Sequence, residues 1–236
     1  MTGPAPAPVR EECYVCFRAK KNCLCGSVKP FATRMRFVIL MHTKEARKQR
    51  TGTARLAWMC LENAELFIGT EFARDERVNS LLRDPAYAPF VLYPGPTAVN
   101  FKGMDRAALP EGKVPLVFVI DGTWNTARTL LNKSPNVKVL PRLSFAGNYV
   151  SRFAIKRQPK PHCVSTIEAI YHLCREAEDA GYEKLGAAPG VLMEILRKLV
   201  DIQLLHSRRH HHRREDNKKI RRARPPGDRE ENTCPK

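Results

Sequence analysis

The sequence predicts an α/β fold, with a mostly parallel sheet and flanking helices, preceded by a small cysteine-rich module. Short apolar runs of strand length alternate with segments of helical spacing, a pattern typical of parallel sheets with crossover helices. Four of the eight cysteines lie within residues 13–30, ahead of the first apolar run. We therefore expect this module to be separate from the main domain.

The strands are expected at short apolar runs that polar or glycine-containing segments follow. These runs are residues 36–41, 65–68, 90–93, 115–120 and 137–140. Helices are expected where apolar residues recur three and four positions apart. These segments are residues 53–63, 78–83 and 125–131, a helix beyond Ser165, and a last helix from 191 to about 205.

The charge balance indicates a polyanionic partner. The chain has 41 Lys and Arg against 24 Asp and Glu, a formal net charge of +17. This excess favours nucleic acid over a neutral metabolite. No apolar run approaches the roughly 18 residues of a membrane span, and the first residues lack a signal-peptide pattern. These features predict a cytoplasmic protein with no membrane partner, whose cysteines are thiols or metal ligands.

Composition divides the chain into four segments. Residues 1–12 are expected to be a flexible leader, 13–30 the cysteine module and 31–206 the main domain. Residues 207–236 are charge-dense and nearly free of apolar side chains, so they cannot bury enough surface to fold alone. We expect this basic tail to be disordered, or ordered by RNA.

Polar or glycine-containing residues directly follow three of the expected strands. The three blocks are residues 42–45, 93–97 and 121–124. In open α/β sheets the carboxyl ends of the strands line the ligand crevice, so one shared cleft is expected. In the last block, Trp124 lies beside Asp121 and Thr123. Its indole either stacks on a flat ligand ring or fills the core.

Cys13, Cys16, Cys23 and Cys25 supply four soft ligands within a short segment. Such a set suits a tetrahedral zinc ion held by thiolates, and an ion with sulfur in all four positions is expected to be structural. The alternative is a set of packed or redox-active thiols. Packing is disfavoured because this polar segment offers no apolar core.

Ser165 and Glu168 fit a helix capping box, which by itself explains both residues. The amino end of the same helix, with Thr166, also offers amides and partial positive charge to a ligand carboxylate or hydroxyl. A basic segment precedes this helix, and it suits either an RNA-facing strand or loop or an ordinary surface strand. Its three cations are Arg152, Lys156 and Arg157.

The sequence resembles the DTW-domain family, named for the Asp-x-Thr-Trp signature that stands here at residues 121–124. The cysteine cluster CYVCFRAKKNCLC resembles the family's amino-terminal zinc ribbon. Three further blocks resemble the family in the same order, and they read HTKEARKQRTGTARL, LYPG and SRFAIKRQPKPHCVSTIEA. Together the blocks cover about residues 13–175, which is far more specific than the four-residue signature.

The resemblance implies a SPOUT-like, possibly knotted α/β fold and an enzyme that uses S-adenosylmethionine as co-substrate. The family is similar to enzymes that transfer the 3-amino-3-carboxypropyl group to the ring nitrogen N3 of a uridine in tRNA, releasing methylthioadenosine. Catalytic roles are then expected for Asp121, Thr123 and Trp124. Asp121 is expected either to accept or orient the imide proton, or to orient the cofactor.

The same resemblance implies two binding sets. The cofactor-binding set is Tyr93, Pro94, Gly95, Ser165, Thr166 and Glu168, and the RNA-binding set is Arg152, Lys156 and Arg157. Two alternatives stay open: a SPOUT-type RNA methyltransferase, and a noncatalytic zinc-ribbon RNA-binding protein. A Rossmann methyltransferase is disfavoured because no GxGxxG fingerprint follows a strand.

Overall fold

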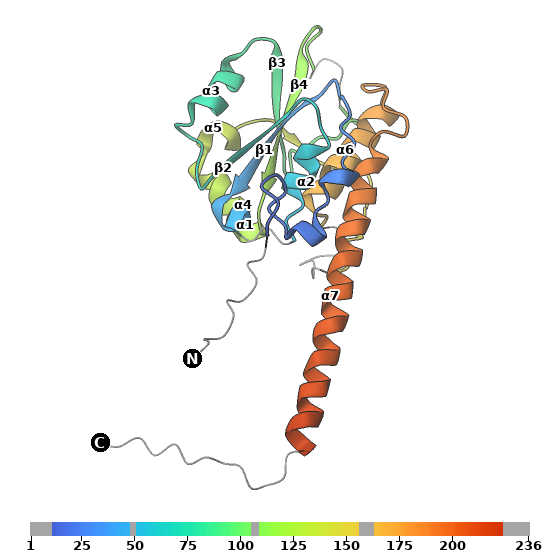
Figure 1. Ribbon diagram of the computed structural model, residues 1–236. Helices are drawn as coiled ribbons and strands as arrows, with labels where there is room; N and C mark the ends of the chain where they lie inside the picture. The colour runs from blue at the N-terminus through green and yellow to red at the C-terminus, as the bar shows by residue number, and fades with distance from the viewer. Residues whose placement is uncertain (1–10, 48–50, 105–108, 156–162, 224–236) are drawn as a thin grey trace, which may run out of the picture.

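A parallel sheet of five strands forms the centre of the molecule in the computed structural model (Figure 1). The structure describes residues 11–47, 51–104, 109–155 and 163–223. The sheet order is β2-β1-β4-β3-β5, and every pairing is parallel. The strands are β1 Arg36–His42, β2 Ala64–Gly69, β3 Tyr87–Leu92, β4 Val114–Asp121 and β5 Arg142–Leu143.

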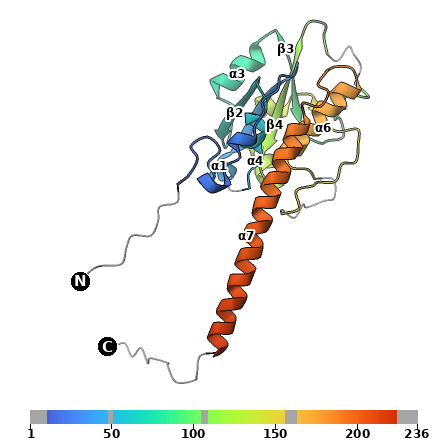
Figure 2. The same ribbon diagram turned by 45° about the vertical axis from the view of Figure 1, so that its right-hand side comes forward.

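Helices cover both faces of the sheet because the inner strands are apolar on both sides. Phe37 and Ile39 of β1 face one set of helices, and Val38 and Leu40 face the other. The first set is α2 Ala54–Met59, α6 Thr166–Asp179 and α7 Gly190–Ala223. The second set is α3 Glu76–Arg83, α4 Trp124–Lys133 and α5 Pro135–Lys138. The result is a three-layer arrangement (Figures 1 and 2).

The connections leave β1 and β4 in opposite directions. β1 continues through α1 (Thr43–Arg47) and α2 to β2 at one edge of the sheet, whereas β4 continues through α4 and α5 to β5 at the other edge. Adjacent strands whose connections diverge leave a crevice outside their carboxyl ends, and ligands of open α/β sheets bind there. The topology therefore places the expected site at the carboxyl ends of β1 and β4.

Four of the expected strands are confirmed, but the strand expected at residues 137–140 is wrong. Pro135–Lys138 form helix α5 instead. Proline suits the first position of a helix because its φ is fixed near the helical value and its missing N–H is not needed there. Val137 is buried in the core from this helix, and the fifth strand follows it as β5.

The helix expected at residues 53–63 is shorter and ends at Met59. The chain pairs there with Phe31, whose amide donates to the Cys60 carbonyl at 3.0 Å and whose carbonyl accepts from the Glu62 amide at 3.1 Å. These bonds tie the segment before β1 to the segment before β2. A backbone bridge thus takes the place of a further helical turn.

The carboxyl-terminal helix is longer than expected. Composition predicts no regular structure from residue 207, but α7 continues to Ala223 and projects beyond the sheet layers (Figure 2). After Gly190 the segment contains no glycine or proline before Pro225, and it is rich in Arg and Lys, which are good helix formers. Residues 1–10 of the leader expected at 1–12, and the last residues, 224–236, lie outside the described part of the chain.

Candidate active site and cysteine module

A cavity of about 650 Å³ opens at the carboxyl ends of β3 and β4. Its volume lies within the range of roughly 300–1,000 Å³ found for small-molecule sites. Two of the three blocks expected to share a cleft, 93–97 and 121–124, meet here with the expected cofactor-binding residues of the α6 amino end. Those that line it are Tyr93, Pro94, Asp121, Thr123, Trp124, Ser165 and Thr166.

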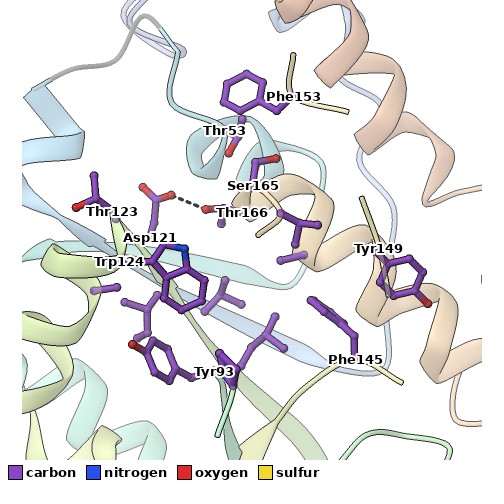
Figure 3. Close-up of a pocket in the computed structure, with 18 of the residues that line it drawn as sticks. Thr53, Tyr93, Asp121, Thr123, Trp124, Phe145, Tyr149, Phe153, Ser165 and Thr166 are labelled. Carbon is purple, nitrogen blue, oxygen red and sulfur yellow. Dashed lines mark hydrogen bonds between the residues drawn. The ribbon is translucent and has the colours of Figure 1, made fainter. Parts of the chain in front are cut away.

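Asp121 joins the sheet to the amino end of α6. It is the last residue of β4 and is only 7% exposed. Its Oδ1 accepts a hydrogen bond of 2.5 Å from Oγ1 of Thr166, the first residue of α6 (Figure 3). A carboxylate is thus held at the positive end of a helix dipole, on the wall of the cavity. This geometry can bind or orient a cationic ligand group, or take a proton from one.

Thr123 and Trp124 begin helix α4. Thr123 is its N-cap, and the Thr123 Oγ1 accepts from the Thr126 amide at 3.3 Å. The Trp124 side chain is 40% exposed and meets Tyr93 edge to face, with ring centroids 5.9 Å apart (Figure 3). Of the two roles expected for Trp124, core filling is excluded. The indole and the Tyr93 ring instead form an aromatic wall of the cavity.

Gly95 lies beside the cavity rather than on its wall. A side-chain β-carbon at this position would lie 2.5 Å from Nη1 of Arg142. That guanidinium donates to the Pro94 carbonyl at 3.1 Å and lies over the Tyr93 ring, 5.5 Å from its centroid. Glycine thus leaves room for the close approach of an arginine that contacts Tyr93 and Pro94.

Glu168, expected to contact cofactor, is fully buried and does not line the cavity. Its Oε2 accepts from the amide and hydroxyl of Ser165 at 2.8 and 2.6 Å, which completes the predicted capping box. The same carboxylate accepts from the Ser151 hydroxyl at 2.8 Å and the Arg152 amide at 2.6 Å. Glu168 is thus a positioning residue that fixes the amino end of α6 to the segment near residue 151.

Glu176 holds the opposite wall of the cavity, a role that the sequence analysis missed. It is 3% exposed and accepts hydrogen bonds from the Ala146 amide, the Gly147 amide and the Tyr149 hydroxyl at 2.8–3.1 Å. Tyr149 lines the cavity and stacks on His172, with centroids 3.7 Å apart. Burial and the hydrogen bond to Glu176 raise the pKa of Tyr149 to about 12. The available signal was an acidic residue on the apolar face of α6.

The first polar block, residues 42–45, contributes one residue to the cavity wall. Glu45 lines the cavity, as do residues 51–53 just before α2. His42 is 6% exposed, and its Nδ1 accepts from the Lys44 amide at 3.1 Å, while burial lowers its pKa. His42 therefore serves the turn between β1 and α1.

The expected RNA-binding cations are only partly described. Arg152 borders a second depression of about 370 Å³, together with Arg197, Glu194 and apolar residues of α7. Lys156 and Arg157 lie outside the described residues. Basic side chains of two distant segments, 152 and 197, therefore meet on one surface.

The four cysteines of the module converge. The Sγ atoms of Cys13, Cys16, Cys23 and Cys25 all lie within 4.8 Å of one another, and none forms a disulfide. Backbone amides of Cys16 and Val15 lower the pKa of Cys13 to about 6, whereas burial and the neighbouring thiols raise the pKa of Cys25. Four sulfur donors at this spacing fit a tetrahedral metal ion with no open position. The cluster can therefore bind a metal.

Arg18 connects the cysteine module to the cavity. It is 5% exposed and donates to the Cys16 carbonyl at 3.1 Å and to the Gly52 carbonyl at 2.7 Å. Gly52 is a wall residue of the cavity. The module also contacts α7, where Lys198 donates to Ser27 at 3.0 Å. It is thus fastened to the main domain on two sides.

Fold and site together define an α/β protein with a cavity at the carboxyl ends of β3 and β4, one strand away from the switch point between β1 and β4. The chain belongs to the DTW domain family, whose model matches residues 10–204. No solved structure matches the chain. In the described part of the chain, helices long and apolar enough to cross a membrane are absent.

Similar curated proteins carry one name, tRNA-uridine aminocarboxypropyltransferase 2. The protein of Mus musculus is 28% identical over 84% of this chain, and that of Macaca fascicularis is 27% identical over 86%. The Drosophila melanogaster protein is 28% identical over 69% of the chain. The chain spans 65–66% of the length of these relatives.

Proposed function

We propose that this protein transfers the 3-amino-3-carboxypropyl group of S-adenosylmethionine to N3 of a uridine in tRNA, releasing methylthioadenosine. The observation that carries the proposal is the pairing of Asp121 with Thr166 on the wall of an aromatic-lined cavity. Membership of the DTW domain family and the names of the similar proteins support it.

The main requirement of this reaction is that the enzyme aligns the uracil N3 with one carbon of the sulfonium. The uracil N3 attacks the γ-carbon of the methionine arm, the carbon–sulfur bond breaks towards sulfur, and methylthioadenosine leaves as a neutral thioether. The N3 proton must leave as the new carbon–nitrogen bond forms. Since three carbons are bonded to the sulfonium, the carbon held in line with N3 determines the product. We assign this alignment to the cavity.

The chain offers groups suited to each part of the ligands. Asp121 either accepts the N3 proton or holds the ammonium group of the methionine arm, and the amino end of α6 suits the carboxylate of that arm. Trp124 and Tyr93 provide flat surfaces for a nucleobase. The cavity volume of about 650 Å³ leaves room for more than the adenosyl group alone.

The surface charge supports tRNA as the second substrate. The net charge of +17 favours a polyanion, and Arg152 with Arg197 forms a basic edge of the second depression. We extend the proposal to RNA contact by Arg152, Lys156 and Arg157 and to a cytoplasmic setting. The all-parallel order β2-β1-β4-β3-β5 supports assignment to the SPOUT-like class.

The test is transfer of label from S-adenosylmethionine to an unmodified tRNA transcript. One donor carries the label in its methyl group and the other in the aminocarboxypropyl carbons. The proposal requires label in RNA only from the second donor. Label from the methyl group alone would establish the methyltransferase alternative, and binding of tRNA without any transfer would establish a noncatalytic RNA-binding protein.

Donor binding can be measured apart from turnover. The chain has two tryptophans, so Trp58→Phe leaves Trp124 as the single indole, on the cavity wall. We expect S-adenosylmethionine to change the fluorescence of this variant. Unchanged fluorescence together with no heat of binding in calorimetry would contradict the proposed donor site.

We further propose that the metal of the cysteine module is zinc. Four thiolates are a common structural zinc set, and metal binding to such a set is coupled to folding. Replacing Cys13 and Cys16 with Ser is expected to abolish zinc binding and lower the unfolding temperature. Elemental analysis and thermal unfolding measure the two effects. A wild-type protein that is purified without metal and has full stability would contradict the proposal.

A further inference from the structure

The turn between the first two cysteines exposes large apolar side chains to solvent. Tyr14 is 89% exposed, Val15 53% and Phe17 42%. We call residues 13–17 the aromatic turn. It stands out because three of its five side chains are large, apolar and exposed to water, whereas Cys16 between them is buried. Clustered exposure of this kind indicates an interaction site, whereas single exposed apolar residues do not.

The aromatic turn is held in one conformation. Phe17 has a φ of 55°, in the left-handed region that bulky residues rarely adopt. The Phe17 amide donates to the Cys13 carbonyl at 2.8 Å, and the Cys13 amide donates to the Arg18 carbonyl at 2.7 Å. The guanidinium of Arg55 lies over the Phe17 ring, 4.4 Å from its centroid. Backbone and side-chain contacts thus keep the Phe17 ring at the surface.

The turn lies at the same end of the sheet as the cavity. Arg18, the residue after the turn, reaches Gly52 on the cavity wall. Arg55 follows two residues after Thr53, another wall residue. In Figure 1 the module lies beside α2 and α7, at the end of the sheet where α1 and α4 follow their strands. A ligand bound in the cavity can therefore continue onto the turn.

We propose that the aromatic turn is a stacking surface for unpaired nucleotides of the RNA substrate, with Tyr14 and Phe17 as the stacking rings. This inference rests on the proposed function, because it assumes that RNA reaches the cavity. Unpaired nucleotides expose flat base faces that stack on aromatic side chains whatever the base. Arg55 and the exposed Lys21 lie close enough in sequence and fold to contact the adjoining phosphates.

RNA fits this surface better than a protein partner does. Three side chains are too few for a stable protein interface, which buries roughly 1,600 Å² in total. Lysine is also depleted at such interfaces, whereas Lys20 and Lys21 lie three and four residues after the turn in the short helix η1 Lys20–Asn22, with Lys20 paired to Glu11 at 2.8 Å. Aromatic rings interleaved with cations are instead typical of surfaces that bind single-stranded nucleic acid.

The test is tRNA binding by Tyr14→Ala, measured with an unmodified tRNA transcript at several salt concentrations. We expect the Kd to rise roughly 5- to 150-fold, as for the loss of one stacked base. The dependence of binding on salt is expected to stay unchanged, because stacking releases no counterions. Lys21→Ala is expected to lower that dependence. Tyr14→Phe keeps the ring and is expected to bind normally.

The matched control is Val139→Ala, which removes another highly exposed apolar side chain, at the end of α5. It is expected to bind tRNA as the wild type does. Zinc content and thermal unfolding should match in all variants, which excludes a folding defect as the cause. Wild-type tRNA affinity in Tyr14→Ala would overturn the proposal.

Two further outcomes separate this inference from the proposed function. If the wild type transfers label but Tyr14→Ala has an unchanged KM for tRNA, the proposed stacking surface is wrong and the proposed function is retained. If no label is transferred while Tyr14→Ala loses tRNA affinity, the proposed function is wrong and the proposed stacking surface is retained. Binding of anionic phosphatidylserine vesicles that Tyr14→Ala loses, with tRNA affinity intact, would overturn the proposal in favour of a lipid surface.

Discussion

The cavity has two walls that the chain builds by different means. The sheet wall carries Asp121 and Tyr93 directly at the ends of β4 and β3, where backbone ladders with neighbouring strands fix their positions. The loop wall consists of residues 144–153, which form no helix or extended strand. Two buried glutamates of α6, Glu168 and Glu176, hold it through hydrogen bonds.

Because the two walls are held by different contacts, substitutions in them are expected to affect the fold differently. The sheet wall depends on many apolar contacts, so one polar substitution there leaves its geometry in place. The loop wall depends on two carboxylates, each of which satisfies several donors. Removing one acceptor leaves buried donors unpaired, which costs more than the hydrogen bond itself contributed. We therefore expect a substitution on the sheet wall to lower the transfer rate more than the stability. A substitution on the loop wall should lower the stability first.

The largest expected effect is on the sheet wall, from Asp121→Asn. The amide keeps the shape of the side chain and its carbonyl oxygen can still accept from Thr166, so folding should be nearly unchanged. It cannot take up a proton or pair with an ammonium group as a carboxylate does. We expect transfer to fall by roughly 10²- to 10⁴-fold, the range for loss of a general acid or base.

Single-turnover experiments measure the transfer rate of Asp121→Asn, and thermal unfolding measures its stability. The matched control is Asp75→Asn, because Asp75 caps α3 and pairs with Arg77 away from the cavity. It is expected to lower stability slightly and leave transfer intact. Wild-type rates in Asp121→Asn would remove this residue from the mechanism.

The second largest effect is expected on the loop wall, from Glu168→Gln. Glutamine keeps one accepting oxygen, but its NH2 group only donates, so some of the donors from Ser165, Ser151 and Arg152 lose their partner. We expect the free energy of unfolding to fall by about 1–3 kcal/mol. Because the loop wall then loosens, S-adenosylmethionine should bind several-fold more weakly. Chemical denaturation and calorimetry test both effects, and unchanged donor affinity would show that the loop wall does not shape the site.

The two walls also differ in how well the sequence predicts them. The apolar run before Asp121 predicts a buried strand, and burial of a parallel strand determines where the next residues emerge. The positions of Asp121, Trp124 and Tyr93 were therefore predictable. The role of Glu176 was not, because its partners are backbone amides some 30 residues earlier in the chain. No local pattern encodes such a contact.

The helices show the same limit. Val137 and Val139 flank Lys138 in a strand-like alternation, but Pro135 and the packing of Val137 against the core make this segment helical. Glu168 illustrates a subtler case, since the capping box was predicted and is present. Its bonds to Ser151 and Arg152 were not predictable, and they turn a local cap into a support for the loop wall.

A smaller effect is expected from Glu176→Gln, compared with Glu178→Gln on the same helix. Both glutamates accept from two backbone amides, but Glu176 holds the cavity wall, whereas Glu178 holds Leu185 and Gly186 outside it. We expect Glu176→Gln to lose about 1 kcal/mol or more of unfolding free energy, and Glu178→Gln to be destabilised as well. Only Glu176→Gln should also weaken donor binding. Equal donor affinities in the two variants would mean that Tyr149 and its loop do not contact the donor.

The smallest effect concerns pH and Tyr149. Burial and Glu176 raise the Tyr149 pKa to about 12, above the ordinary tyrosine value of about 10. A folded state with the higher pKa holds the proton more tightly, so this contribution to stability is complete below pH 10 and is lost as the pH rises towards 12. We expect wild-type stability to fall more steeply in that window than the stability of Tyr149→Phe, which has no proton to lose. Chemical denaturation at each pH measures the free energy of unfolding of both proteins. If this free energy falls equally with pH in the two, there is no hydrogen bond from Tyr149 to Glu176, and this part of the loop wall is not attached to α6 through it.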